Sequence, residues 1–367
     1  MSPTRAKNEV LVRPSALERF VTKVFEAAGM AGSEANFCAR ALVQSNLWGI
    51  DSHGVLRVPT YTRRLLSGAM NPRPQIRSLR GAAGLEVLDG DDGPGFLVGR
   101  AAMERAIELA EEINVGVVGA IRSNHYGAGA IYSRLAVERG MVGIAMTNVV
   151  PNMVAPGGSE PVVGNNPLTL AFPTFGEFPF VLDIALSNAS GGKILLADSR
   201  GEAIPKDWAT DSEGRETTDP QEALMTMLLP LGGHKGLGLA YAVELLCGVM
   251  TGGVFLDEMK GMYTHPDVPS LTSHLMIAIN PLALLSESEL KNRMTRFIRT
   301  IKQAQMWDET KEMLIPGEIE HRTARQRHEG GIPLPRALYE ELQELGLELG
   351  IADKLASSTD ETIGEIP

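Results

Sequence analysis

The chain has 367 residues, of which 44% are hydrophobic and 22% charged, and its formal net charge is −11. This length exceeds what one hydrophobic core usually serves, so two domains are expected. The acidic balance argues against a nucleic-acid partner, because phosphate binding requires a basic face. A small anionic ligand is compatible with this balance if a few cations converge locally.

The N-terminal part of the chain predicts mainly helices. Apolar residues recur at three- and four-residue spacing over 15–28 and 33–48, and a third helix is expected over 59–67, where Gly68 ends it. The stretch "GIDSHGVLRVP" lies between the second and third of these helices. It combines an acid, a hydroxyl, an imidazole and a guanidinium. Taken alone, it is either a helix cap or a reactive site.

From about residue 79 the pattern changes to alternating strands and helices. Strands are predicted at 84–90, 115–121, 141–149, 168–173, 179–185 and 274–280, and helices at 101–113 and about 128–138. The apolar run 236–256 is long enough for a membrane span, but Glu244 near its centre favours a buried helix. These elements predict an α/β domain over 79–284.

Helices return towards the C-terminus, at 287–304 and 336–347, with a loop rich in glycine and proline between them. The two ends, 1–78 and 285–352, are expected to form one discontinuous helical domain, and 353–367 a polar tail.

The sequence also bears on location. The first residues carry charge but no apolar core, so no signal peptide is expected. The two cysteines, Cys38 and Cys247, have no metal-ligand spacing and are expected to be core thiols in a reducing compartment. We therefore predict a cytoplasmic protein.

Three glycine-containing turns precede predicted helices, where backbone N–H groups suit a phosphate or a carboxylate. The first, with Gly93, Gly95 and Gly99, also carries three aspartates, so an ordinary turn is favoured. The other two, "SNHYGAG" and "LGGHKG", contain His125 and His234. Either histidine could be a helix cap or a ligand contact.

Further polar residues stand at predicted strand ends and in a late loop, and none is specific alone. They are Asn165, Asn166, Asp183, Ser187, Lys193 and the segment 316–318.

Taken in order, the blocks DSHG, SNHYGAG, GNNPL, DIALS, GGHKGLGLA, INP and IPGE resemble the type 2 malate/L-lactate dehydrogenase family of NAD(P)-dependent oxidoreductases, over about residues 12–351. The resemblance implies an α/β fold that is not a Rossmann fold. It has a cofactor domain with a largely antiparallel central sheet, and a helical domain built from both chain ends. It also implies NAD or NADP as cofactor and a homodimer. No metal, nucleic acid or membrane partner is expected.

The resemblance also implies roles for individual residues. On the substrate side, His53 matches the acid/base histidine, Ser52 the hydroxyl beside it and Arg57 the carboxylate-binding arginine. A guanidinium fork suits a carboxylate, and an imidazole with a pKa of about 6 to 7 suits the hydroxyl proton. Further substrate contacts are implied at Tyr61, Asn165 and Lys193. The implied cofactor-binding residues are His125, Tyr126, Gly127, Ala128, Gly129, Asp183, Ile184, Ala185, His234, Lys235, Pro316, Gly317 and Glu318.

Two predictions follow for the glycines and histidines of these loops. Cofactor affinity is expected to tolerate Gly95→Ala but not a bulky residue at Gly127. His125 is a second candidate for the acid/base, and we predict that His53 holds this role.

Some positions depart from the family pattern. Asn165 and Leu186 replace common threonines, and Gly191 stands where a bulky or basic residue is frequent. Lys193 stands where the imino-acid reductases tend to place an aspartate, which argues against imine reduction.

The predicted function is an NAD(P)-dependent oxidoreductase of a small 2-hydroxy/2-oxo acid of the malate, lactate, sulfolactate or ureidoglycolate type. The alternatives are a cyclic ketimine reductase, a non-catalytic ligand-binding member of the same fold and a metal hydrolase. The last lacks any closely spaced ligand pair such as HExxH.

Overall fold

The computed structural model describes residues 9–352 and 355–356. It divides into two compact units. The terminal unit comprises the described part of Met1–Arg73 and Thr295–Pro367, and the central unit comprises Pro74–Met294. Most of the predicted tail lies outside the described residues. Within that tail Leu355 is buried, and its carbonyl accepts a hydrogen bond from the Tyr339 hydroxyl at 2.6 Å.

The terminal unit is mainly helical. Its elements are β1 (Glu9–Val12), α1 (Pro14–Ala27), α2 (Gly32–Leu47), α3 (Val58–Ser67), α10 (Glu318–Gly330), β11 (Ile332–Pro335) and α11 (Arg336–Glu348). The apolar faces of α1 and α2 supply its core, with Leu17, Val24 and Leu42 fully buried. Antiparallel pairing of β1 with β11 joins the two ends of the chain.

Helix α10 corrects the sequence prediction, which had a loop in this region. Glycine and proline occur only at its ends, at Pro316, Gly317 and Gly330. Its interior is polar, and Glu318 is its only buried residue, so it gives almost no apolar periodicity from which to predict a helix.

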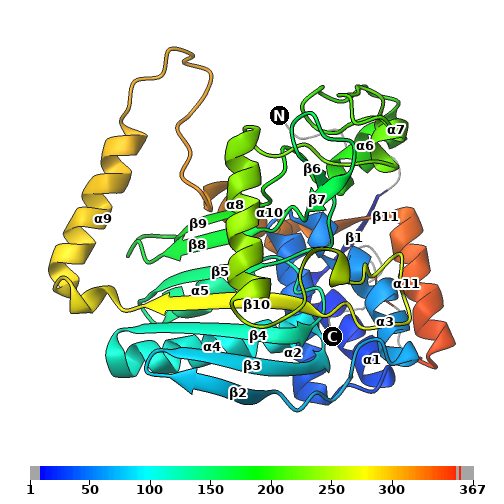
Figure 1. The fold of residues 1–367 in the computed structure, drawn as a ribbon, viewed down its shortest axis with the longest axis horizontal. Helices are drawn as coiled ribbons and strands as arrows, with labels where there is room; N and C mark the ends of the chain where they lie inside the picture. The colour runs from blue at the N-terminus through cyan, green and yellow to red at the C-terminus, as the bar shows by residue number, and fades with distance from the viewer. Residues whose placement is uncertain (1–8, 353–354, 357–367) are drawn as a thin grey trace, which may run out of the picture. The chain divides into compact units, whose positions relative to one another are not determined.

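The central unit is built on a seven-stranded sheet in the order β2-β3-β4-β10-β5-β8-β9. Its strands are β2 (Arg77–Ala82), β3 (Leu85–Gly93), β4 (Val115–Ser123), β10 (Thr272–Ile279), β5 (Val142–Thr147), β8 (Leu168–Phe172) and β9 (Phe180–Ile184). Strands β3 and β4 run parallel, and each of the other neighbouring pairs is antiparallel. The predicted largely antiparallel sheet is thus confirmed (Figure 1). A separate short pair joins β6 (Met153–Val154) and β7 (Pro161–Val163).

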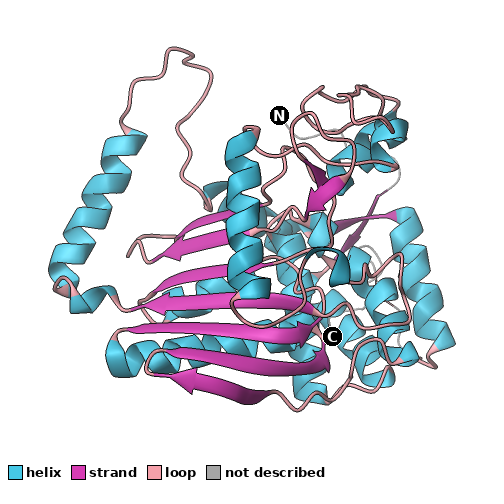
Figure 2. Cartoon of the chain, viewed as in Figure 1, coloured by secondary structure: helices cyan, strands magenta, loops and turns pink. Residues whose placement is uncertain are grey.

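Helices cover both faces of this sheet (Figure 2). Helices α4 (Gly95–Ile113) and α5 (Ala130–Glu138) pack on one face, and α8 (His234–Glu244) packs on the other. The side chains of Met146, Leu237 and Leu275 belong to the buried cluster beneath α8. Two further helices, α6 (Gly191–Arg200) and α7 (Pro220–Leu224), lie in the segment between β9 and α8.

The predicted buried helix over 236–256 is wrong in two respects. Helix α8 ends at Glu244 and continues as a single π-helical turn, η3 (Leu245–Val249). Only one face is buried, because Leu245 is 52% and Met250 73% exposed. Apolar residues on both faces gave no sign of which face meets the core. Among the described residues, no helix has the length and apolar character needed to cross a membrane.

Helix α9 (Glu287–Lys302) has no buried residue along its 16 positions. An apolar stripe nevertheless runs along it at helical spacing, formed by Leu290, Met294, Phe297, Ile298 and Ile301. Phe297 is 51% exposed. An amphipathic helix of this kind is typical of a surface that a partner covers.

Candidate active site

The segment after α2 forms two consecutive 3₁₀ turns, η1 (Asp51–His53) and η2 (Val55–Arg57). Ser52 Oγ lies 2.9 Å from His53 Nδ1, and Arg57 Nε donates to the backbone oxygen of Ser52 at 2.7 Å. The turn therefore brings the hydroxyl, the imidazole and the guanidinium together. The aspartate does not act as a helix cap, because neither η1 nor α3 has a side-chain cap.

The electrostatic surroundings of His53 differ from the expectation. Burial, together with the positive charge of Arg57, lowers the pKa of His53 to about 4. The value of about 6 to 7 anticipated from the sequence is therefore wrong for the protein alone. At neutral pH the ring is uncharged, and its Nδ1 either donates to or accepts from the Ser52 hydroxyl according to the tautomer.

Two other predicted site segments lie in the terminal unit. Tyr61 on α3 is 3% exposed, and burial raises the pKa of its hydroxyl. Glu318 begins α10, and its carboxylate accepts hydrogen bonds from Lys302 Nζ at 2.8 and 2.9 Å, from the backbone N–H of Ile315 at 3.1 Å and from Arg322. Burial opposes ionisation, but these donors hold the pKa of Glu318 below its usual range. Its side chain thus anchors the start of α10.

In the central unit, the loop Asn124–Gly129 connects β4 to α5. The buried Asn124 amide donates to the backbone oxygens of Asp92 and Gly93 at 2.8 and 3.1 Å, and its oxygen accepts from the N–H of Ser270 at 3.2 Å. The N–H of Gly127 donates to His125 Nδ1 at 3.3 Å. Because Nδ1 accepts, a neutral His125 carries its proton on Nε2 and presents a donor there.

Tyr126 of this loop is the middle member of a stack of three rings. The ring of Tyr126 lies between those of Tyr132 and His274, at centroid distances of 5.0 and 4.9 Å. His274 also bridges two strand ends, with Nδ1 2.7 Å from Thr147 Oγ1 and Nε2 2.7 Å from Ser123 Oγ. Burial lowers the pKa of His274 to about 3. Sequence reasoning missed His274, which looked like any residue of a strand.

The glycine turn before α4 has an unexpected part in this arrangement. A Cβ atom on Gly95 would come far inside 3.0 Å of the backbone oxygens of both Asn124 and His125. The backbone of the loop therefore packs directly against Gly95. This packing does not support the expectation that Gly95→Ala leaves cofactor affinity unchanged. The fingerprint-like glycine is required for backbone packing.

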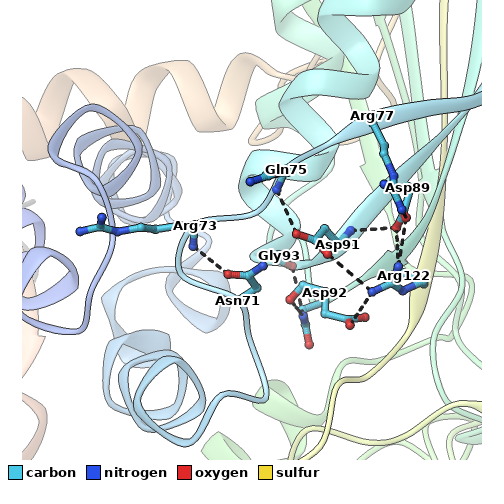
Figure 3. Close-up of polar contacts among 10 residues, drawn as sticks. Asn71, Arg73, Gln75, Arg77, Asp89, Asp91, Asp92, Gly93 and Arg122 are labelled. Atoms are coloured by element: carbon cyan, nitrogen blue, oxygen red, sulfur yellow. Dashed lines mark hydrogen bonds and ion pairs between the residues drawn. The ribbon is translucent and has the colours of Figure 1, made fainter.

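The acidic residues of the same turn are neutralised within the protein (Figure 3). Arg122 Nη1 lies 3.0 Å from Asp89, and Nη2 lies 2.9 Å from Asp92 and 3.7 Å from Asp91. Arg77 makes a second ion pair with Asp89, at 3.3 Å. Three carboxylates held in this way leave no positive field for a phosphate, which agrees with the ordinary turn predicted here.

Asp183 at the end of β9 joins this strand to the same loop. Its Oδ1 accepts from Thr169 Oγ1 at 2.6 Å, and its Oδ2 accepts from the N–H of Ala130 at 2.9 Å. A carboxylate at the first turn of α5 stabilises the helix and fixes the loop that precedes it. Ile184 and Ala185 follow Asp183 directly in the sequence.

The GNNP segment is organised around a buried carboxylate. Glu244 is 4% exposed and accepts from Asn166 Nδ2 at 2.7 Å, from Asn148 Nδ2 at 3.2 Å and from the N–H of Leu256 at 3.0 Å. Asn165 is half-buried, with its N–H bonded to Asn152 Oδ1 at 2.8 Å. The sequence showed Glu244 only as an obstacle to membrane insertion.

Three predicted basic residues lie at helix starts of the central unit. His234 and Lys235 begin α8 and are exposed, and the preceding Gly232 and Gly233 have positive φ and open space around them. Lys193 is exposed in the first turn of α6. An open helix N-terminus with two adjacent basic side chains fits a negatively charged phosphate.

The predicted site residues thus fall into two sets, one in each unit. The terminal unit holds Ser52, His53, Arg57, Tyr61 and 316–318, and the central unit holds the others. Among the described residues, no group of three or more His, Cys, Asp or Glu side chains is arranged to hold a metal ion.

Comparison with known proteins identifies the family. The profile of the family described as malate/L-lactate dehydrogenase matches residues 12–343. L-sulfolactate dehydrogenase of Methanocaldococcus jannaschii is 36% identical over 342 residues, which cover 93% of this chain and 98% of the relative. Malate dehydrogenase of Pyrococcus abyssi is 36% identical over 353 residues, covering 94% and 96%.

Solved structures agree with this assignment. The sulfolactate dehydrogenase structure from Methanocaldococcus jannaschii superimposes with a TM-score of 0.87, covering 93% of this chain and 98% of that one. With the profile and the relatives pointing the same way, the chain belongs to the malate/L-lactate dehydrogenase family.

Proposed function

We propose that this enzyme oxidises a small 2-hydroxy acid, and reduces the matching 2-oxo acid, at the turn that carries Ser52, His53 and Arg57. The carrying observation is the convergence of these three side chains over two short turns. Arg57 supplies a planar fork for the substrate carboxylate. His53 exchanges the hydroxyl proton. The bound nicotinamide supplies or accepts the hydride.

The hydrogen bond between Ser52 and His53 defines how the proton moves. For Nε2 to accept the substrate's hydroxyl proton, Nδ1 must carry the ring proton and donate it to Ser52 Oγ. That bond persists when the imidazolium forms, so Ser52 orients the ring in both states. An anionic substrate beside Arg57 offsets the charge that lowers the pKa of His53, which makes the ring a stronger base in the complex.

For the cofactor, we propose a site without a Rossmann glycine motif. The loop His125–Gly129, the main chain of Asp183–Ala185 and the N-terminus of α8 with His234 and Lys235 would hold it, together with 316–318. The buried hydroxyl of Tyr126 has no hydrogen-bond partner among the described residues, which supports a further polar contact at this loop. Neither NAD nor NADP is favoured by these residues.

The remaining substrate contacts are proposed at Tyr61, Asn165 and Lys193. The exposed ammonium of Lys193 suits a second anionic group, such as the carboxylate of malate or the sulfonate of sulfolactate. The named relatives act on sulfolactate and malate, so neither imine reduction nor a purely ligand-binding role is favoured.

A panel assay tests the function. NADH and NADPH are offered with oxaloacetate, pyruvate, 3-sulfopyruvate, oxalurate and a cyclic ketimine carboxylate, and the loss of reduced nicotinamide is followed by absorbance. Turnover of at least one open-chain 2-oxo acid is expected. Turnover of the cyclic imine alone, or of nothing with cofactor bound, would refute the proposal.

We also propose a homodimer, with the stripe on α9 covered by a second copy. The stripe's five apolar residues and the absence of any buried residue on α9 support this. Phe297→Asp should shift the mass measured by light scattering towards the monomer, whereas the exposed Arg296→Asp should not. The buried thiols Cys38 and Cys247 support a reducing, cytoplasmic setting.

A further inference from the structure

The turn that carries Ser52, His53 and Arg57 needs support from outside itself. Each of η1 and η2 is only three residues long, and η1 has no side-chain cap. Short 3₁₀ segments have poor hydrogen-bond geometry and little stability of their own. Yet catalysis requires the imidazole and the guanidinium to keep a fixed relation.

Asn46, in the last turn of α2, ties the two short turns together. It is 2% exposed, its Nδ2 donates to Asp51 Oδ1 at 2.6 Å, and its Oδ1 accepts from the N–H of Val55 at 2.8 Å. A Cβ atom on Gly54 would come well inside 3.0 Å of this amide. The glycine of DSHG is therefore required so that the asparagine can pass close to the backbone.

Arg327 on α10 completes this support. Its guanidinium makes a bidentate ion pair with Asp51, through Nη1 to Oδ1 at 2.6 Å and Nη2 to Oδ2 at 2.9 Å. Nη1 also donates to the backbone oxygen of Asn46. Arg327 is 17% exposed. The Arg327 side chain thus contacts both the end of α2 and the first of the two turns, although it lies 276 residues from Asp51 in the sequence.

We propose that Arg327 is a positioning residue, which acts through Asp51 and Asn46 to hold Ser52, His53 and Arg57 in their working arrangement. It does not touch the substrate. Because Arg57 Nε bonds to the Ser52 carbonyl, a displaced turn also displaces the carboxylate-binding fork. The planar guanidinium matches both oxygens of Asp51, which a lysine does not. This inference rests on the proposed function of the turn.

The test is a double-mutant cycle with Arg327→Gln and Asp51→Asn, measured on the 2-oxo acid that gives the highest turnover. Each single variant is expected to lower kcat/KM at least tenfold, with the dissociation constant of the nicotinamide cofactor unchanged. The double variant should lie within about threefold of the worse single variant, because both remove one interaction. Arg327→Lys should recover part of the loss.

The control is Arg63→Gln, which breaks an exposed pair with Glu341 in the same unit and should leave kcat/KM unchanged. Thermal unfolding identifies a variant that fails to fold. If Arg327→Gln does so, Asp51→Asn and Arg327→Lys decide the question. Full activity in these variants, or losses that multiply in the double variant, would overturn the inference. A wild-type enzyme inactive on every 2-oxo acid would instead refute the proposed function.

Discussion

Two loops of this protein each present a histidine, and they are held in different ways. The turn Asp51–Arg57 is fixed by a charged, partly exposed pair with Arg327 and by one buried amide. The loop Asn124–Gly129 is fixed mainly by uncharged contacts, namely the Asn124 amide, an aromatic stack and the close approach of Gly95, with the Asp183 carboxylate at its end. The first arrangement depends on an ion pair, and the second depends mainly on side-chain and backbone volume. Their sensitivities to mutation should therefore differ in kind.

The largest effect should separate the two histidines. His53→Ala is expected to lower kcat by about 10² to 10⁴, because a positioned acid/base contributes that much, with cofactor affinity nearly unchanged. His125→Ala should mainly weaken cofactor binding, measured by fluorescence of the reduced nicotinamide. If His125→Ala abolishes turnover at saturating cofactor while His53→Ala stays active, the two roles are exchanged.

The pH profile sharpens the same contrast. Oxidation needs neutral His53, so kcat/KM should be flat through neutrality and fall only as pH drops through about 4. Reduction needs the protonated ring, so kcat/KM should fall about tenfold per pH unit above that value. Profiles measured in both directions check this. A bend near neutrality that vanishes in His53→Ala would show that the free enzyme has an ordinary histidine pKa.

The next effect concerns the carboxylate fork. Arg57→Lys keeps the charge but loses the two parallel N–H groups, so kcat/KM should fall by about one to three powers of ten. Steady-state kinetics with the preferred 2-oxo acid measures this, and cofactor affinity serves as the internal control. Normal activity in the lysine variant would remove Arg57 from the substrate site.

The loop Asn124–Gly129 should be the more sensitive of the two to added side-chain volume. Gly95→Ala is expected to weaken cofactor binding at least tenfold, because the added methyl displaces the backbone of Asn124 and His125. Gly330→Ala is the matched control, since no atom lies within 4 Å of the added carbon. Unchanged cofactor affinity in Gly95→Ala would restore the expectation drawn from the sequence and separate the glycine from the loop.

The smallest effect is on stability, through His274. Its pKa is about 3 in the folded chain and about 6.5 when unfolded, so protons favour the unfolded state as pH falls below 6.5. From pH 7 to pH 5 this histidine should cost about 2 kcal/mol of the free energy of unfolding. Denaturant titration of wild type and His274→Phe at both pH values should show a flatter dependence in the variant. Replacement of the exposed His265 should leave the pH dependence of the free energy of unfolding unchanged. A pH dependence in His274→Phe equal to that of the wild type would contradict this account.

The sequence identified the candidate functional residues of both loops, but not the distant residues that hold these loops in place. Ser52, His53 and Arg57 lie within six residues, so a local motif could identify them. Arg327 and His274 act from more than a hundred residues away, and a single sequence gives no measure of such pairing. The same limit explains α10, whose polar interior has no apolar period, and the exposed face of α8, whose apolar residues do not show which side meets the core.

The pairing of β1 with β11 has a consequence for the order of folding. The central unit is one continuous segment and needs only residues up to 294. Residues 9–12 have no strand partner until residues 332–335 have been synthesised, and Asp51 has no ion pair with Arg327 until residue 327 has been synthesised. Because a growing chain folds its complete segments first, the loop proposed to bind nicotinamide should assemble while the turn proposed for catalysis remains unformed. The proposed proton-transfer group would therefore reach its working arrangement after the central unit has folded.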